Sequence, residues 1–135
     1  MSLALLQRYV SLVEQLAGVP MLPAVTQYSL FFDMAGWHTD TGHAVPSAKV
    51  VAYLEPLDGL NGALRVLPGS HRFDERVLTD LLHGPAFGDE ARVREATWQI
   101  PAHVITSRPG DVIVFDEHLW HASVGGRNRL QWSTC

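Results

Sequence analysis

The stretch KVVAYLEPLDGLNGALRVLPGSH, residues 49–71, decides the fold. It holds two β-like runs, Lys49 to Leu54 and Ala63 to Leu67, with the dipeptides Asp58-Gly59 and Asn61-Gly62 between them. Asp-Gly and Asn-Gly favour tight turns, so we expect the two runs to pair as antiparallel strands. Short strands separated by frequent turns are typical of sandwiches and barrels.

The same rhythm continues on both sides of this stretch. Four further runs have a β-like composition: Val25 to Phe32, Val104 to Thr106, Val112 to Phe115 and Leu130 to Cys135. Pro109-Gly110 is another turn signal, and it favours pairing between the strands on either side of it. The sequence therefore predicts a mainly β domain built from antiparallel strands.

Two segments have the period of a helix instead. The residues from Leu3 to Leu16 carry apolar side chains at helical spacing, which predicts an amphipathic helix. Between Asp74 and Leu82, an acidic first turn and an apolar side predict a short surface helix, ended by Gly84-Pro85. The charged stretch from Phe87 to Glu95 is interpreted as a mobile loop.

Composition bounds the remaining possibilities. With 135 residues and 47% hydrophobic side chains, we expect one packed domain over residues 1–135. A net charge of −4 without a basic run argues against a nucleic-acid partner, and charged residues inside Leu3 to Leu16 argue against a membrane span. A single Cys135 favours a reducing, cytoplasmic setting. Cys135 also falls inside an apparent strand, which is consistent with a natural protein that extends beyond one or both ends.

The chemistry-bearing motif is Trp37-His38-Thr39-Asp40. Side chains two apart on extended backbone point the same way, so His38 and Asp40 can offer two ligands to one metal. His118 and His121, just after a predicted strand, are candidates for a third ligand. Two imidazoles and one carboxylate make the facial set that leaves three positions open on non-haem iron(II). With seven histidines in the chain, a His-x-Asp triplet can also arise by chance, so it needs wider support.

That support comes from a set of ordered motifs. Gly62 to Arg72, Pro109 to Asp116 and Trp120 to Ser123, together with Trp37 to Asp40, resemble the phytanoyl-CoA dioxygenase family in order and spacing. The resemblance covers roughly Gln27 to Ser133. It implies a double-stranded β-helix, a jelly-roll or cupin-like barrel, with one or two flanking helices. It also implies two cofactors, Fe(II) and 2-oxoglutarate.

The family's site residues carry over position by position. The resemblance implies that His38, Asp40 and His121 are the metal ligands and form the catalytic centre, with His118 as the reserve candidate. The distal carboxylate of 2-oxoglutarate suits the planar fork of an arginine, and Arg129 is the first candidate for it. The spacing from His121 is shorter than is usual in the family, so Arg127 stays open as the alternative. Two further residues are predicted to contact the co-substrate: Gln27 and Ser133.

The resemblance implies an Fe(II)- and 2-oxoglutarate-dependent dioxygenase. It would hydroxylate a small organic or carrier-bound substrate with dioxygen, and release succinate and CO2. Because Asp40 is present where halogenating relatives have a small residue, hydroxylation is favoured over halogenation. Two alternatives stay open: a cupin-type isomerase with another metal, and a non-catalytic binding protein on the same barrel. Gly69-Ser70-His71 is predicted to serve a turn, and Arg65 to lie on the outer face of its strand.

Overall fold

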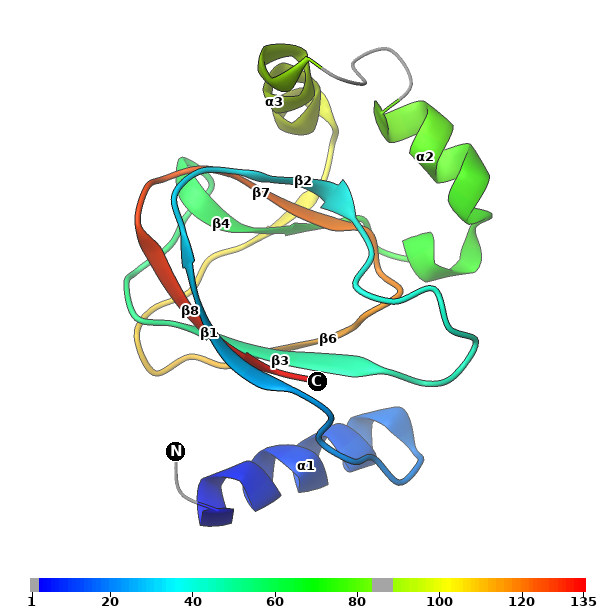
Figure 1. Ribbon diagram of the computed structural model, residues 1–135, viewed down its shortest axis with the longest axis vertical. Helices are drawn as coiled ribbons and strands as arrows, with labels where there is room; N and C mark the ends of the chain where they lie inside the picture. The colour runs from blue at the N-terminus through cyan, green and yellow to red at the C-terminus, as the bar shows by residue number, and fades with distance from the viewer. Residues whose placement is uncertain (1–2, 84–88) are drawn as a thin grey trace.

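Two antiparallel sheets face each other in the computed structural model, which describes residues 3–83 and 89–135. One sheet, called here the β3 sheet, has the strand order β1-β8-β3-β6, and the other, the β7 sheet, has the order β2-β7-β4-β5. Figure 1 shows the two sheets as the walls of a barrel. The strands are β1 (Thr26–Phe31), β2 (Ala35–His38), β3 (Ala48–Tyr53), β4 (Asn61–Val66), β5 (His103–Ile105), β6 (Ile113–Asp116), β7 (His121–Gly125) and β8 (Arg129–Thr134).

The chain passes from one sheet to the other at every connection except the one between β4 and β5. All pairings are antiparallel. This alternation is the double-stranded β-helix, so the predicted mainly β barrel is confirmed.

The expected pairing of neighbouring strands is wrong at both predicted turns. β3 pairs with β6 and β8, and β4 pairs with β5 and β7, so the turn at Asp58 and Asn61 leads across the barrel. Pro109-Gly110 likewise connects β5 to β6 in the opposite sheet. A turn dipeptide reports a local reversal of the chain, whereas the hydrogen-bonding edges of each strand are filled by segments that are distant in sequence.

Two strands lie where no strand was predicted. β2 and β7 have the sequences AGWH and HASVG, with few of the β-branched residues that favour strands. They pair with each other, with Ala35 opposite Ser123 and His38 opposite His121, and the register shifts between these pairs. Their strand character comes from this long-range pairing and from burial.

Helices cover the outer faces of both sheets (Figure 1). α1 (Leu3–Ala17) lies below the β3 sheet, where Val13 packs with Val50 and Trp132. α2 (Glu75–His83) and α3 (Glu90–Gln99) lie beyond the β7 sheet, and an ion pair joins Arg94 of α3 to Asp33. The helices predicted over Leu3 to Leu16 and Asp74 to Leu82 are therefore confirmed. Among the helices of the described segments, none is long and apolar enough to cross a bilayer.

The loop predicted from Phe87 to Glu95 is wrong for its second half, because α3 begins at Glu90. Asp89 caps this helix by accepting hydrogen bonds from the backbone N–H groups of Ala91 and Arg92. An N-cap aspartate stabilises a helix by satisfying amides that have no partner inside it. Phe87 and Gly88 lie outside the described residues.

Both apolar and polar side chains line the interior of the barrel. An apolar cluster that includes Val51, Leu64 and Phe115 fills the space between the sheets. Side chains alternate along β3, so Lys49 faces the same interior as Val51 and Tyr53. Polar side chains thus share the interior with an apolar core, and this is where a site can form.

Candidate active site

His38, Asp40 and His121 converge on one point. One potential ligand atom from each lies within 4.8 Å of the other two. His121 Nε2 is 3.3 Å from Asp40 Oδ2, His38 Nε2 is 3.9 Å from Asp40 Oδ1, and the two imidazole centroids are 4.3 Å apart. Two imidazoles and one carboxylate in this arrangement fit a divalent metal such as iron(II) and leave coordination positions free.

Strand pairing brings these residues together. The β2–β7 ladder sets His38 directly opposite His121. Asp40 follows β2 by two residues, and its backbone N–H donates to the carbonyl of Glu117 at 3.0 Å. Glu117 belongs to the turn that precedes β7, so the same turn fixes both Asp40 and the start of the strand carrying His121.

Backbone carbonyls orient both imidazoles. His38 Nδ1 lies 2.7 Å from the carbonyl of Gly36, and His121 Nδ1 lies 2.9 Å from that of Leu119. A carbonyl only accepts hydrogen bonds, so each Nδ1 carries a proton and Nε2 is the ring nitrogen that can face a metal. This is the arrangement in which metal-binding histidines are held.

Burial and charge favour the protonation states that bind metal. Desolvation and the neighbouring His121 lower the pKa of His38, which keeps its imidazole neutral. For Asp40, burial alone raises the pKa, but hydrogen bonds with His121 and Lys49 outweigh it and hold the pKa well below its usual value. The Asp40 side chain is 16% exposed and its carboxyl stays ionised, so it can offer a charged oxygen beside the two imidazoles.

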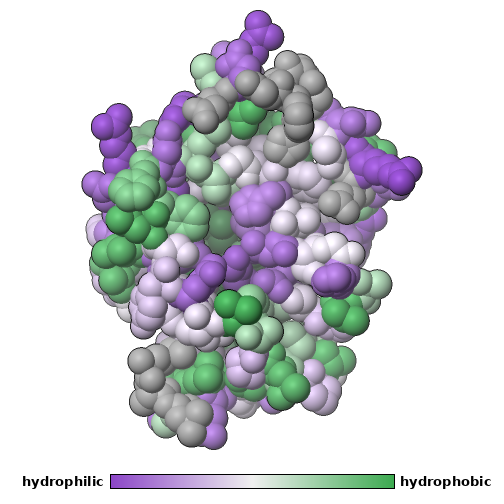
Figure 2. Space-filling model, in the orientation of Figure 1, coloured by the Kyte–Doolittle hydropathy of each residue, from purple (hydrophilic) through white to green (hydrophobic). Residues whose placement is uncertain are grey.

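A small cavity opens beside the three residues and is lined from both sheets. Val51, Leu64 and Phe115 form part of its apolar wall. Its polar lining consists of His38, Lys49, Tyr53, His121, Ser123, Arg129 and Gln131. In Figure 2, hydrophilic side chains gather around a hollow near the middle of the face shown. A largely apolar cavity with a few convergent polar groups is the usual form of a small-molecule site.

Arg129 forms one wall of the cavity and is only 2% exposed. Its Nη1 donates to the carbonyl of Gly62 at 2.7 Å, and its Nη2 donates to that of Asp33 at 2.5 Å. Among the described residues, its Nε has no hydrogen-bond partner. Desolvation lowers the pKa of Arg129. A fixed, buried guanidinium with an unused N–H donor fits the carboxylate of a small molecule.

The other predicted contacts lie elsewhere. Arg127 is exposed on the connection between β7 and β8, and Gln27 is exposed on β1. Ser133 is buried on the inner face of β8, opposite Gln27 and Val51. None of these three side chains lines the cavity, whereas Gln131 on the same strand face does.

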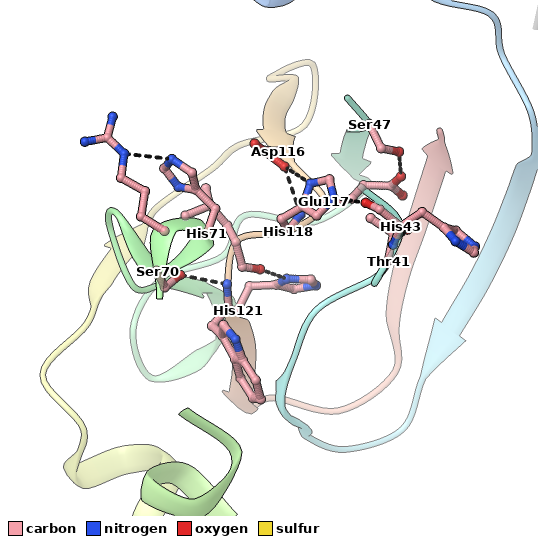
Figure 3. A network of polar contacts seen from close by, with 12 residues as sticks. Thr41, His43, Ser47, Ser70, His71, Asp116, Glu117, His118 and His121 are labelled. Carbon is pink, nitrogen blue, oxygen red and sulfur yellow. Dashed lines mark hydrogen bonds and ion pairs between the residues drawn. The ribbon is translucent and has the colours of Figure 1, made fainter. Parts of the chain in front are cut away.

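His118, the reserve ligand candidate, is not part of the cluster. Its Nδ1 lies 2.7 Å from Asp116 Oδ1 and its Nε2 lies 2.5 Å from the carbonyl of His43 (Figure 3). His118 therefore fastens the segment after the His-x-Asp motif to the turn before β7.

Ser70 and Arg65 have structural contacts. The Ser70 hydroxyl accepts a hydrogen bond from the backbone N–H of Trp120 at 2.9 Å (Figure 3), which confirms the predicted turn role. The Arg65 guanidinium lies 4.4 Å from the ring of Trp98 on α3, so it is on the outer face of β4 as predicted, but buried under a helix.

One residue at the site was missed by the sequence analysis. Lys49 Nζ lies 2.9 Å from Asp40 Oδ1. Lys49 is the only lysine of the 135 residues, and it opens an otherwise apolar strand. A single lysine at an inward position of a predicted strand was the available signal, because an unpaired ammonium is costly to bury.

Comparisons with known proteins agree with this architecture. A model of the family "Phytanoyl-CoA dioxygenase (PhyH)" matches residues 23–129. None of the curated proteins matches the chain.

Among solved structures, EvdMO1 is similar with a TM-score of 0.69 and 23% identity, over 93% of this chain and 29% of its own. The non-heme alpha ketoglutarate dependent epimerase SnoN has a TM-score of 0.65 and 19% identity, over 94% and 51%. EctD from S. alaskensis, solved with 2-oxoglutarate and 5-hydroxyectoine, has a TM-score of 0.58 and 24% identity, over 94% and 48%.

At these identities the solved structures establish a shared barrel fold. The chain spans between 29% and 51% of the length of these three proteins. The family model, in contrast, matches most of the sequence, from before β1 to the first residue of β8. The chain therefore belongs to the phytanoyl-CoA dioxygenase family.

Proposed function

We propose that this chain carries the catalytic barrel of an Fe(II)- and 2-oxoglutarate-dependent oxygenase. The observation that carries the proposal is the convergence of His38, Asp40 and His121 beside a cavity whose wall contains Arg129. Family membership supports it, and so does the similar barrel of EctD, which was solved with 2-oxoglutarate.

In this proposal, His38 and His121 hold the metal through Nε2, and Asp40 holds it through a carboxylate oxygen. When bound, iron supplies the oxidising chemistry with dioxygen at its free coordination positions, and 2-oxoglutarate is expected to leave as succinate and CO2. The chain's own contribution is geometric. The carbonyls of Gly36 and Leu119 fix the imidazoles, and the apolar side of the cavity limits access of water.

Arg129 is the proposed partner of the distal carboxylate of 2-oxoglutarate. Its unused Nε and its position in the cavity wall support this role over that of Arg127, which is exposed. Gln131 and Tyr53 line the same cavity and offer further polar contacts. Gln27 and Ser133 are weaker candidates because they do not line it.

The proposed reaction is hydroxylation of a small organic or carrier-bound substrate. Asp40 supports this outcome, because its carboxylate takes the coordination position that halogenation needs for a halide. SnoN, an epimerase on a similar barrel, illustrates that one fold serves more than one reaction. The decisive measurement is therefore use of 2-oxoglutarate, which does not depend on the outcome for the substrate.

The test is anaerobic titration of the folded protein with Fe(II) and then 2-oxoglutarate. We expect the weak visible charge-transfer band of the iron chelate in the wild type and its loss in Asp40→Ala. Admission of oxygen should then give succinate. A folded protein of verified iron content that shows neither band nor succinate would rule the proposal out. An isomerase that uses another metal would show no dependence on 2-oxoglutarate.

A further inference from the structure

The two oxygens of the Asp40 carboxylate have different partners. Oδ1 lies 2.9 Å from Lys49 Nζ and 3.9 Å from His38 Nε2, whereas Oδ2 faces His121 Nε2 at 3.3 Å. The Lys49 side chain is 14% exposed, so this ion pair is largely removed from solvent. A charge-assisted hydrogen bond in such a place is short and directional, and it fixes the rotation of the carboxylate.

The barrel wall holds Lys49 in this place. Lys49 pairs with Phe115 across the β3–β6 ladder, and the Phe115 ring lies edge-on to His121, 4.9 Å between centroids. Phe115 therefore connects β3, the strand that carries Lys49, to the imidazole of His121. An inward position on β3 leaves the lysine stem among the apolar residues of the cavity.

We propose that Lys49 is a positioning residue for the metal ligand Asp40, an inference that rests on the proposed metal centre. Lys49 holds Oδ1, so that Oδ2 alone is offered to the metal beside the two imidazoles. A carboxylate that is free to rotate can bind through both oxygens and occupy one of the positions that the co-substrates need. Lys49 also places a positive charge beside the Asp40 carboxylate, whose side chain is mostly buried.

Cobalt(II) is the probe for this proposal, because it replaces iron(II) in such sites and has visible absorption bands that depend on coordination. The metal alone is titrated into the whole chain without 2-oxoglutarate. Lys49→Met keeps the stem and removes the charge, whereas Lys49→Arg keeps a cationic donor. Arg65→Met is the matched control, because Arg65 is a second buried cation, packed against Trp98 on the outer face of β4, and makes no contact with Asp40 among the hydrogen bonds and ion pairs of the described residues.

We expect Lys49→Met to weaken cobalt affinity about 10- to 100-fold and to change the visible spectrum, as loss of a hydrogen bond to a metal-bound carboxylate generally does. Lys49→Arg should restore most of the affinity, and Arg65→Met should bind cobalt like the wild type. Wild-type affinity and spectrum in Lys49→Met would overturn the proposal, and so would tighter binding, which would mean that the ammonium only competes with the metal for Asp40.

Two further measurements separate the possible failures. Cobalt binding that is lost in His121→Ala but unchanged in Lys49→Met would leave the metal centre standing and remove only the role of Lys49. A wild-type protein that binds no cobalt would overturn both.

Because Lys49 is the only lysine, its reaction with an amine-selective reagent can be followed by mass spectrometry even if Lys49→Met does not fold. Faster labelling in Asp40→Asn than in the wild type supports the contact, and equal rates contradict it.

Discussion

Arg65 lies on the outer face of the β7 sheet and Arg129 on the inner face of the β3 sheet, yet their surroundings share several features. Both are buried, both lie over an aromatic ring, and for both desolvation lowers the pKa. In the described residues, the Nε of each has no partner. Arg129 borders the cavity, however, whereas Arg65 lies between β4 and α3 and donates to the carbonyl of Gly59.

The difference between these two arginines teaches that burial of a cation does not by itself mark a binding site. Arg65 ties a helix and a turn to the outer face of the β7 sheet. Arg129 instead lines the cavity together with His38 and His121. The deciding property is what the buried charge faces, and variants of each residue can separate the two roles.

The largest expected effect is on 2-oxoglutarate binding in Arg129→Met. Loss of a buried charged donor should weaken 2-oxoglutarate affinity by about 100-fold or more, since an unpaired carboxylate is then left in the cavity. The intensity of the chelate band during anaerobic titration measures this affinity. Arg127→Met is the control and should bind nearly as the wild type does, because Arg127 is exposed. A larger loss in Arg127→Met would reverse the assignment of the two arginines.

A smaller effect, on stability alone, is expected for Arg65→Ala. Removal of the contact with Trp98 and the hydrogen bond to Gly59 should lower the free energy of unfolding by about 1–3 kcal/mol. Urea denaturation gives this value, and 2-oxoglutarate affinity of the folded fraction should not change. A loss of 2-oxoglutarate affinity at unchanged stability would contradict a purely structural role of Arg65.

The smallest expected effect is on stability, and it concerns His118. The carbonyl of His43 and then the carboxylate of Asp116 raise the pKa of His118, because both of its ring nitrogens face acceptors. A raised folded-state pKa stabilises the fold below the unfolded value of about 6.5, and the contribution is lost as pH rises through the folded pKa.

His118→Gln should therefore destabilise the protein more at pH 5.5 than at pH 8.5, by less than about 1 kcal/mol, since the contact is partly exposed. Urea denaturation of both proteins at the two pH values measures the difference. An equal loss of stability at both values would mean that the charged form of His118 does not hold the segment carrying His43. Both proteins keep the charged and polar groups around His118 and its partner Asp116 unchanged. These groups belong to His43, His71, Asp116 and Glu117.

The sequence by itself determined the class of fold and predicted the three residues of the candidate metal site. Alternating apolar runs predicted six of the eight strands, and helical periods predicted α1 and α2. These features follow from local backbone geometry, which the side-chain pattern of a short segment reports directly. The His-x-Asp spacing pointed to His38 and Asp40, the resemblance to the family pointed to His121, and the fold brings these three together.

Only the tertiary structure decided which of these groups meet others far along the chain. β2 and β7 are strands because each is the partner of the other, and α3 forms where its capping aspartate and its packing on the β7 sheet outweigh a weak helical pattern. The position of Arg129 in the cavity wall and the burial of Arg65 under Trp98 join distant segments, and the contact between Lys49 and Asp40 joins β3 to the loop that follows β2. Such contacts depend on sheet register and layer packing, which no local pattern of side chains specifies.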